Sequence, residues 1–181
     1  MRPLLSAAVI SGVCLTSLST QAHATYRISI YSDATLSECT LSDASPRVTS
    51  VYVAETSDEA TGLRFRVAAS PGFTGVWLAE TSPFTTIGDS QTDLSIGFGS
   101  CMGGHFLALT ISYQLFGTST CSDLSIVAAP GFPEPLCTSC SFHEVRCSGL
   151  DPLHVNCSGS FDCNPVPVES STWGRVKALY R

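Results

Sequence analysis

The sequence predicts an all-β fold, an antiparallel β-sandwich, from three observations. Apolar and polar residues alternate with a period of two along several short segments. Glycine, proline, serine and aspartate separate these segments, as is typical of turns between strands. Charged residues make up only 13% of the chain and lysine occurs once, at Lys177, so strong helix formers are scarce. Many short strands joined by regular turns are typical of a sandwich.

Seven segments carry the strand pattern. The clearest is 63–67, where Leu63, Phe65 and Val67 are expected on the buried face and two arginines on the other. The longest is 105–116, which we expect to follow a turn at Gly103 and Gly104. The expected strands are 26–31, 48–53, 63–67, 74–80, 94–98, 105–116 and 124–128.

The first 24 residues predict a cleavable secretory signal peptide. Arg2 supplies the positive charge, and the uncharged stretch 3–18 is too short and too rich in Ser and Thr to span a bilayer. Ala22-His23-Ala24 matches the small-residue cleavage site, so the mature chain should begin at Thr25. We therefore expect a secreted or cell-surface, extracytoplasmic protein without a transmembrane span.

The charge of the mature chain argues against nucleic-acid partners. Without Arg2 the chain keeps eight Lys and Arg against fifteen Asp and Glu, a net charge of −7. Such a surface repels the phosphate backbone.

Eight cysteines remain after cleavage of the signal peptide, and an even number in an exported chain predicts disulfides. Three precede the proline-rich break 129–135 and five follow it, so complete pairing requires at least one bridge across the break. Cys101 and Cys121 flank a long strand and should not pair with each other. The disulfide candidates are Cys39, Cys101, Cys121, Cys137, Cys140, Cys147, Cys157 and Cys163.

A zinc site is the alternative use of the later cysteines. Five of them stand with His143 and His154 at spacings that zinc ligands adopt. Behind a signal peptide, disulfides are the favoured interpretation. No cofactor is expected.

The chain after the break predicts a Cys-rich hairpin, formed by 142–147 and 153–157 and docked on the sandwich. We place one disulfide-stapled domain at 25–163. A proline-containing linker and a basic amphipathic tail follow at 164–181. Because the tail is short, it would be helical only if contacts with other groups stabilised the helix. Its apolar residues have helical spacing and its charge is +3. The anchor candidates are Trp173, Arg175, Lys177, Tyr180 and Arg181.

The region 45–128 resembles cohesin-type sandwiches. Residues 94–127, LSIGFGSCMGGHFLALTISYQLFGTSTCSDLSIV, resemble the last third of that fold, and SPGFTGVWL at 70–78 is similar to its earlier bend and strand. This resemblance implies an Ig-like or cohesin-like jelly roll.

The whole chain also resembles a group of uncharacterised secreted bacterial proteins. The matching residues are YSD at 31–33, PGFTGVW at 71–77 and TWGRVKALYR at 172–181. This resemblance implies an exported bacterial protein with a recurrent C-terminal tail.

Two patterns could carry other chemistry. Gly88-Asp89-Ser90 with Asp151 and His154 is similar to the nucleophile and base of GDSL-like serine hydrolases, although that family is α/β and no helices are expected here. Asp89, Gln91 and Asp93 could line a calcium loop, but a solvated turn explains them better.

The remaining candidates have structural interpretations. His105 and His143 are expected to be structural or surface histidines. Trp77 and Tyr113 fit a sandwich core, although an exposed Trp could stack on a sugar.

The sequence thus predicts a secreted, non-catalytic binding, adhesion or scaffold module for an extracellular protein or glycan, with a tail suited to surface attachment. A carbohydrate-binding module is the alternative, and a secreted hydrolase is the least favoured.

Overall fold

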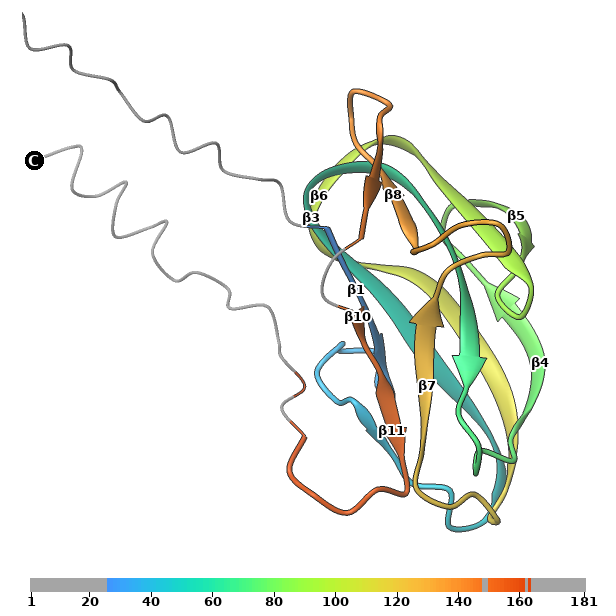
Figure 1. Ribbon diagram of the computed structural model, residues 1–181. Coiled ribbons are helices and arrows are strands. Elements are labelled where there is room, and N and C mark those ends of the chain that lie inside the picture. The colour runs from blue at the N-terminus through green and yellow to red at the C-terminus, as the bar shows by residue number, and fades with distance from the viewer. Residues whose placement is uncertain (1–25, 148–149, 162, 164–181) are drawn as a thin grey trace, which may run out of the picture.

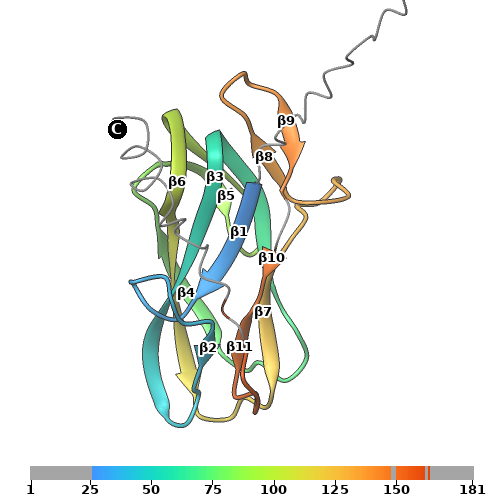
Figure 2. The same ribbon diagram turned by 90° about the vertical axis from the view of Figure 1, so that its left-hand side faces the viewer.

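Two strands of 24 residues each, β3 (Pro46–Ala69) and β6 (Asp93–Phe116), form the frame of the fold. The computed structural model describes residues 26–147, 150–161 and 163. β3 and β6 pair antiparallel and bend together over one end of the molecule, so that their halves lie in opposite layers (Figures 1 and 2). This arrangement is an antiparallel β-sandwich, as predicted.

The first layer contains the early half of β3 and the late half of β6. β1 (Tyr26–Tyr31) pairs with β3, and β4 (Val76–Thr81) pairs with β6 on the other side. β10 (Leu150–Asp151) adds a short parallel strand beside β1. The layer order is therefore β10-β1-β3-β6-β4.

The second layer contains the other halves of the two long strands. β5 (Thr85–Asp89) pairs with the start of β6, and β7 (Ser122–Val127) pairs with the end of β3. β11 (Leu153–Val155) and β2 (Thr40–Leu41) extend the sheet beyond β7. β8 (Leu136–Thr138) pairs with β3 and also with β9 (Glu144–Arg146). β8 and β9 together form a hairpin at one end of the molecule (Figure 1).

The core lies between the two layers and follows the predicted alternation. Leu63, Phe65 and Val67 are buried, and the intervening arginines are half-buried on the outer face. Tyr113 is buried, which with the nearby Glu80 raises its pKa to about 12, and Trp77 is partly buried against the same core. The core interpretation of these two aromatic residues therefore agrees with the structure.

Two pairs of expected strands are joined in the structure. Segments 48–53 and 63–67 both belong to β3, and 94–98 and 105–116 both belong to β6. The predicted turn at Gly103 and Gly104 is wrong, because both residues lie inside β6, where the ladder shifts register opposite Ser57–Gly62. A Cβ on Gly103 would lie 2.5 Å from the carbonyl oxygen of Asp58, so glycine permits a close approach at this bend.

The predicted hairpin between 142–147 and 153–157 is also wrong in its pairing. β9 pairs with β8, whereas β11 pairs with β7 and β2. Leu153 and Val155 are fully buried, so β11 gains more by completing the second layer than by pairing with an exposed hairpin strand. The Cys-rich hairpin exists, but its first strand begins directly after the proline-rich break.

Four disulfides hold the described chain together: Cys39–Cys163, Cys101–Cys140, Cys121–Cys157 and Cys137–Cys147. Three of them cross the break at 129–135, as the odd numbers of cysteines on its two sides require. Cys101 and Cys121 bind different partners, as expected.

The signal peptide, the linker and the anchor candidates of the tail lie outside the described residues. Within the described ranges, no helix is long and apolar enough to cross a membrane.

Candidate functional site

The β8–β9 hairpin is fixed to the sandwich at several points. Cys137–Cys147 joins its two strands, and Cys101–Cys140 ties its turn to β6. The Thr61 hydroxyl donates to the carbonyl oxygens of Thr138 and Ser139 at 3.4 and 3.1 Å. These links make the hairpin a rigid element, and rigid elements position binding residues well.

A hollow of about 520 Å³ lies between this hairpin and the neighbouring parts of β3 and β6. Gly97 forms part of its lining, and a Cβ placed there would meet nothing within 4 Å. The hollow is therefore open above the backbone of β6. Its lining residues are Thr61, Gly62, Leu63, Arg64, Ser95, Ile96, Gly97, Gly99, Ser100, Cys101, Leu136, Thr138, Cys140, Phe142 and Glu144.

Phe142 stands at the hairpin turn and lines this hollow. Its side chain is 79% exposed, and its backbone has a φ of 61°. A bulky residue is uncommon in this left-handed region, which costs roughly 1–2 kcal/mol. The turn is held by Ser139, whose backbone carbonyl accepts from the Phe142 N–H at 2.9 Å and whose hydroxyl accepts from the His143 N–H at 3.2 Å.

One charged pair borders the hollow. Arg64 donates to both carboxylate oxygens of Asp93, at 2.9 and 2.6 Å, and these hydrogen bonds lower the pKa of Asp93. The Arg64 guanidinium also lies 4.3 Å from the ring centroid of Phe132. Arg64 is thereby held in one orientation, with Glu144 on the same lining.

The hydrogen bonds do not assemble the hydrolase triad. Ser90 is fully buried, and its hydroxyl has no hydrogen-bond partner among the described residues. Asp151 accepts from Arg27 at 2.9 Å and from Ser29 at 3.0 Å. His154 pairs instead with Asp123, through Nδ1 and Oδ1 at 2.6 Å. The described part of the chain thus gives the hydrolase no support.

The side chains considered as zinc or calcium ligands make structural contacts instead. All the cysteines proposed as zinc ligands form disulfides, and His143 lies in the exposed hairpin turn, 3.1 Å from the Ser141 hydroxyl. Asp89 accepts from the backbone N–H groups of Gln91 and Thr92, which makes the expected turn. His105 lies 2.7 Å from the Thr56 hydroxyl, and burial lowers its pKa.

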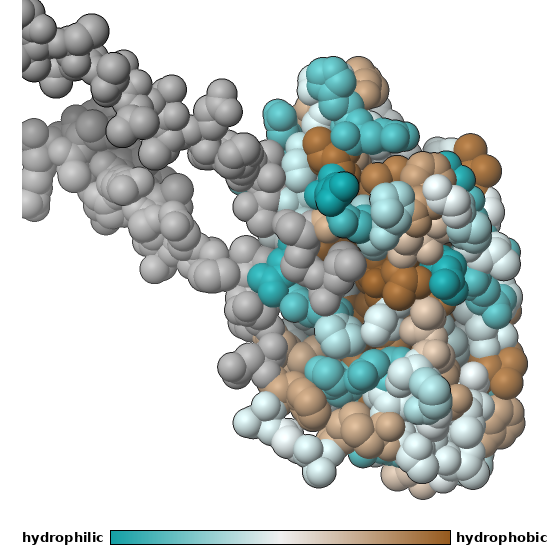
Figure 3. All heavy atoms as spheres, in the orientation of Figure 1, coloured by the Kyte–Doolittle hydropathy of each residue, from teal (hydrophilic) through white to brown (hydrophobic). Residues whose placement is uncertain are grey.

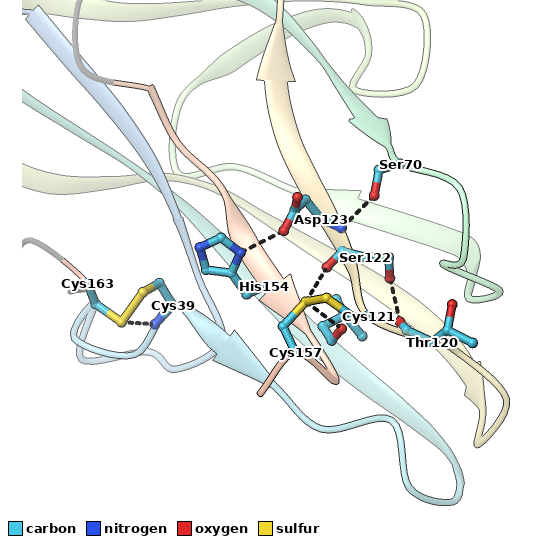
Figure 4. Close-up of polar contacts among 10 residues, drawn as sticks. Cys39, Ser70, Thr120, Cys121, Ser122, Asp123, His154, Cys157 and Cys163 are labelled. Carbon is cyan, nitrogen blue, oxygen red and sulfur yellow. Dashed lines mark hydrogen bonds and ion pairs between the residues drawn. A yellow bond between two sulfur atoms is a disulfide. The ribbon is translucent and has the colours of Figure 1, made fainter. Parts of the chain in front are cut away.

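Sequence reasoning missed the partner of His154 and the exposed position of Phe142 beside the hollow. Asp123 and His154 face each other across β7 and β11, beside the Cys121–Cys157 disulfide (Figure 4). The His154 ring also stacks on Phe161 at 3.8 Å. Neither pairing has a local sequence signal, because Asp123 and His154 come from separate strands and Phe161 lies beyond the end of β11.

Cohesin modules are among the solved structures with a similar arrangement. A type III cohesin from the cellulosomal ScaE cell-surface anchoring scaffoldin of Ruminococcus flavefaciens has a TM-score of 0.54 and 12% identity, over 88% of this chain and 100% of that one. The fold is cohesin-like. The sixth cohesin of scaffoldin B from Acetivibrio cellulolyticus, in complex with a Cel5 dockerin, has a TM-score of 0.50 and 13% identity, over 74% and 99%.

A non-cellulosomal cohesin from the archaeon Archaeoglobus fulgidus is similar too, with a TM-score of 0.52 and 8% identity over 72% of this chain and 91% of that one. No model of a protein family matches the chain, and no curated protein matches its sequence. At these identities the likeness establishes the cohesin-like fold alone.

Proposed function

We propose that this chain is an exported, non-catalytic binding module that holds an extracellular protein partner in the hollow under the β8–β9 hairpin. The cohesin-like fold supports this role, since one similar cohesin is in complex with a dockerin. Four disulfides support an oxidising, extracytoplasmic location at the cell surface or beyond it.

The exposed Phe142 carries the proposal. A phenylalanine that is 79% exposed contributes little to folding, and its left-handed backbone is unfavourable. Strained backbone of this kind occurs where the surrounding structure holds it for function. An aromatic side chain beside a hollow, on a doubly bridged hairpin, is suited to be the central contact of a protein interface.

The surface gives less support to the carbohydrate-binding alternative. Among the described residues, the exposed large aromatic side chains are Phe116 and Phe142, from the end of β6 and from the hairpin. On the face in Figure 3, apolar residues lie in separate spots among hydrophilic ones. A planar aromatic strip, which would favour sugar stacking, is not formed by these residues.

Site-specific photo-cross-linking can test the proposed contact. A photoreactive phenylalanine analogue at position 142 should capture a discrete extracellular protein from the producing culture. The same analogue at Val48, which is 61% exposed on the other layer, serves as the control. Equal capture from both positions, or none from position 142, would contradict the proposal.

Filling the hollow gives a second test. Gly97→Leu should place a side chain in open space without disturbing the fold, and should weaken binding of the captured protein at least about tenfold. Thr81→Leu adds a similar side chain on exposed β4 and should bind normally. Unchanged binding by a folded Gly97→Leu variant would exclude the hollow as the site.

The proposed role includes surface attachment through the basic tail. Its charge is opposite to that of the rest of the chain, and each Lys or Arg near an anionic membrane surface contributes about 1 kcal/mol. Deletion of 170–181 should release the protein from the cell surface with an unchanged melting temperature. A large loss of stability with unchanged localisation would show that the tail belongs to the folded domain.

A further inference from the structure

The four disulfides differ in their accessibility. Cys137–Cys147 is buried at both ends, and Cys39 is buried in its bridge to Cys163. The other two bridges are more accessible, and they match each other. Cys101 and Cys121 are exposed, and their partners Cys140 and Cys157 are half-buried. Accessibility alone therefore does not distinguish these two bridges in their reactivity toward thiols.

Their charged neighbours do distinguish them. A ring nitrogen of His154, a carboxylate oxygen of Asp123 and the Sγ of Cys157 all lie within 4.8 Å of one another. At the other bridge, a carboxylate oxygen of Glu59 lies within 4.8 Å of the sulfurs of Cys101 and Cys140. Each of these two bridges thus has a carboxylate nearby, but Cys157 also has an imidazole, which stabilises a thiolate when it is protonated.

His154 is held in place for this role. Its Nδ1 lies 2.6 Å from Asp123 Oδ1 (Figure 4). Its ring also stacks on Phe161. A hollow of about 480 Å³ is lined by His154 and by Cys157, the leaving sulfur of the step below, whereas Cys121 is not part of its lining.

We propose that the Cys121–Cys157 disulfide is an exchange site for low-molecular-weight thiols. The thiolate of the incoming compound attacks the Sγ of Cys121, which is an exposed residue, and forms a new sulfur–sulfur bond there. The bond to Cys157 breaks, and its electron pair leaves with Cys157 as a thiolate beside the His154 imidazolium. One disulfide is exchanged for another, so no further oxidant or reductant is needed.

Two backbone carbonyl groups would favour the neutral thiol of Cys157, so release of Cys157 as a thiolate depends on His154. The carbonyl oxygens of Ser122 and Val155 lie 3.7 and 3.5 Å from Cys157 Sγ, where they would accept the proton of a neutral thiol. Without the histidine, Cys157 would therefore be a poor leaving group. With it, the leaving thiolate gains an ion pair, and a better leaving group speeds exchange.

Peptide mapping after exposure to reduced glutathione tests the site. The oxidised protein is incubated, acid-quenched, alkylated and analysed by mass spectrometry. We expect the glutathione adduct on Cys121, and exchange severalfold faster than at Cys101–Cys140, since a stabilised leaving thiolate departs faster. The matched Cys101–Cys140 bridge is the control within the same molecule.

Two variants separate the charge of His154 from its packing. His154→Gln and His154→Phe both remove the imidazolium, and the second keeps an aromatic ring against Phe161. Both should reduce the rate ratio of the two bridges to about one. Equal rates in the unmodified protein, an adduct on Cys157 instead of Cys121, or an unchanged ratio in both variants would each overturn the proposal.

Discussion

Glu55 is a buried acid in the core of the sandwich. It lies on β3 opposite Ile28 of β1 and Phe106 of β6, and none of its surface is exposed. Its two carboxylate oxygens have no hydrogen-bond partner among the described residues. Burial raises the pKa of Glu55 from 4.5 to about 8, and the nearby Ser57 hydroxyl offsets only part of this rise.

The raised pKa makes stability depend on pH. The unfolded chain ionises Glu55 near pH 4.5, whereas the folded chain keeps it protonated up to about pH 8. The folded state is therefore penalised increasingly as the pH rises through this window. At about 1.4 kcal/mol per pKa unit, the penalty is about 3 kcal/mol at pH 7 and between about 4 and 5 kcal/mol above pH 8.

Glu55→Gln removes this penalty because the amide stays neutral. Compared with the unmodified protein, its free energy of unfolding should gain about 4 kcal/mol between pH 5 and pH 9. Urea denaturation of both proteins across this range measures the difference, and other titrating groups cancel in it. Glu38→Gln, at an exposed position, should show no such trend. A difference that stays flat with pH, or a Glu55→Gln variant that is less stable throughout, would show that Glu55 is ionised and paired in the folded protein.

Four further changes have defined expected effects on stability. Gly62→Ala should destabilise the folded protein by roughly 1–3 kcal/mol, since its Cβ would lie 2.6 Å from a backbone oxygen. Gly97→Ala, whose Cβ lies in open space, should be neutral or stabilising by up to about 1 kcal/mol. Urea denaturation measures both effects. Phe142→Gly should stabilise the fold by about 1 kcal/mol, because it relieves backbone strain, and so raise the melting temperature; it should also abolish binding of the protein captured by the cross-linking experiment. A lower melting temperature would contradict the strain. Replacing Cys137 and Cys147 by alanine should cost about 3 kcal/mol, as expected for a 10-residue separation, and calorimetry should detect it.

The extent of the strands shows where sequence patterns stop being informative. Strand β1 was predicted with the bounds that the structure has, because its alternation ends at a clear turn. The middle of β3 reads as a break, since Glu55, Ser57 and Asp58 are polar, yet the chain continues as one bent strand. Polar residues there mark a bend between layers, and only the pairing with β6 reveals it.

The sequence by itself determined the all-β class, the alternating core of the long strands and the need for a disulfide across the proline-rich break. These properties depend on local periodicity and on counting, both of which are present in one dimension. Only the tertiary structure decided which cysteines pair, that β9 joins β8 rather than β11, and that Asp123 meets His154. Such contacts join residues up to 124 positions apart, and the free energy that selects them comes from burying side chains of both layers together, which no local pattern encodes.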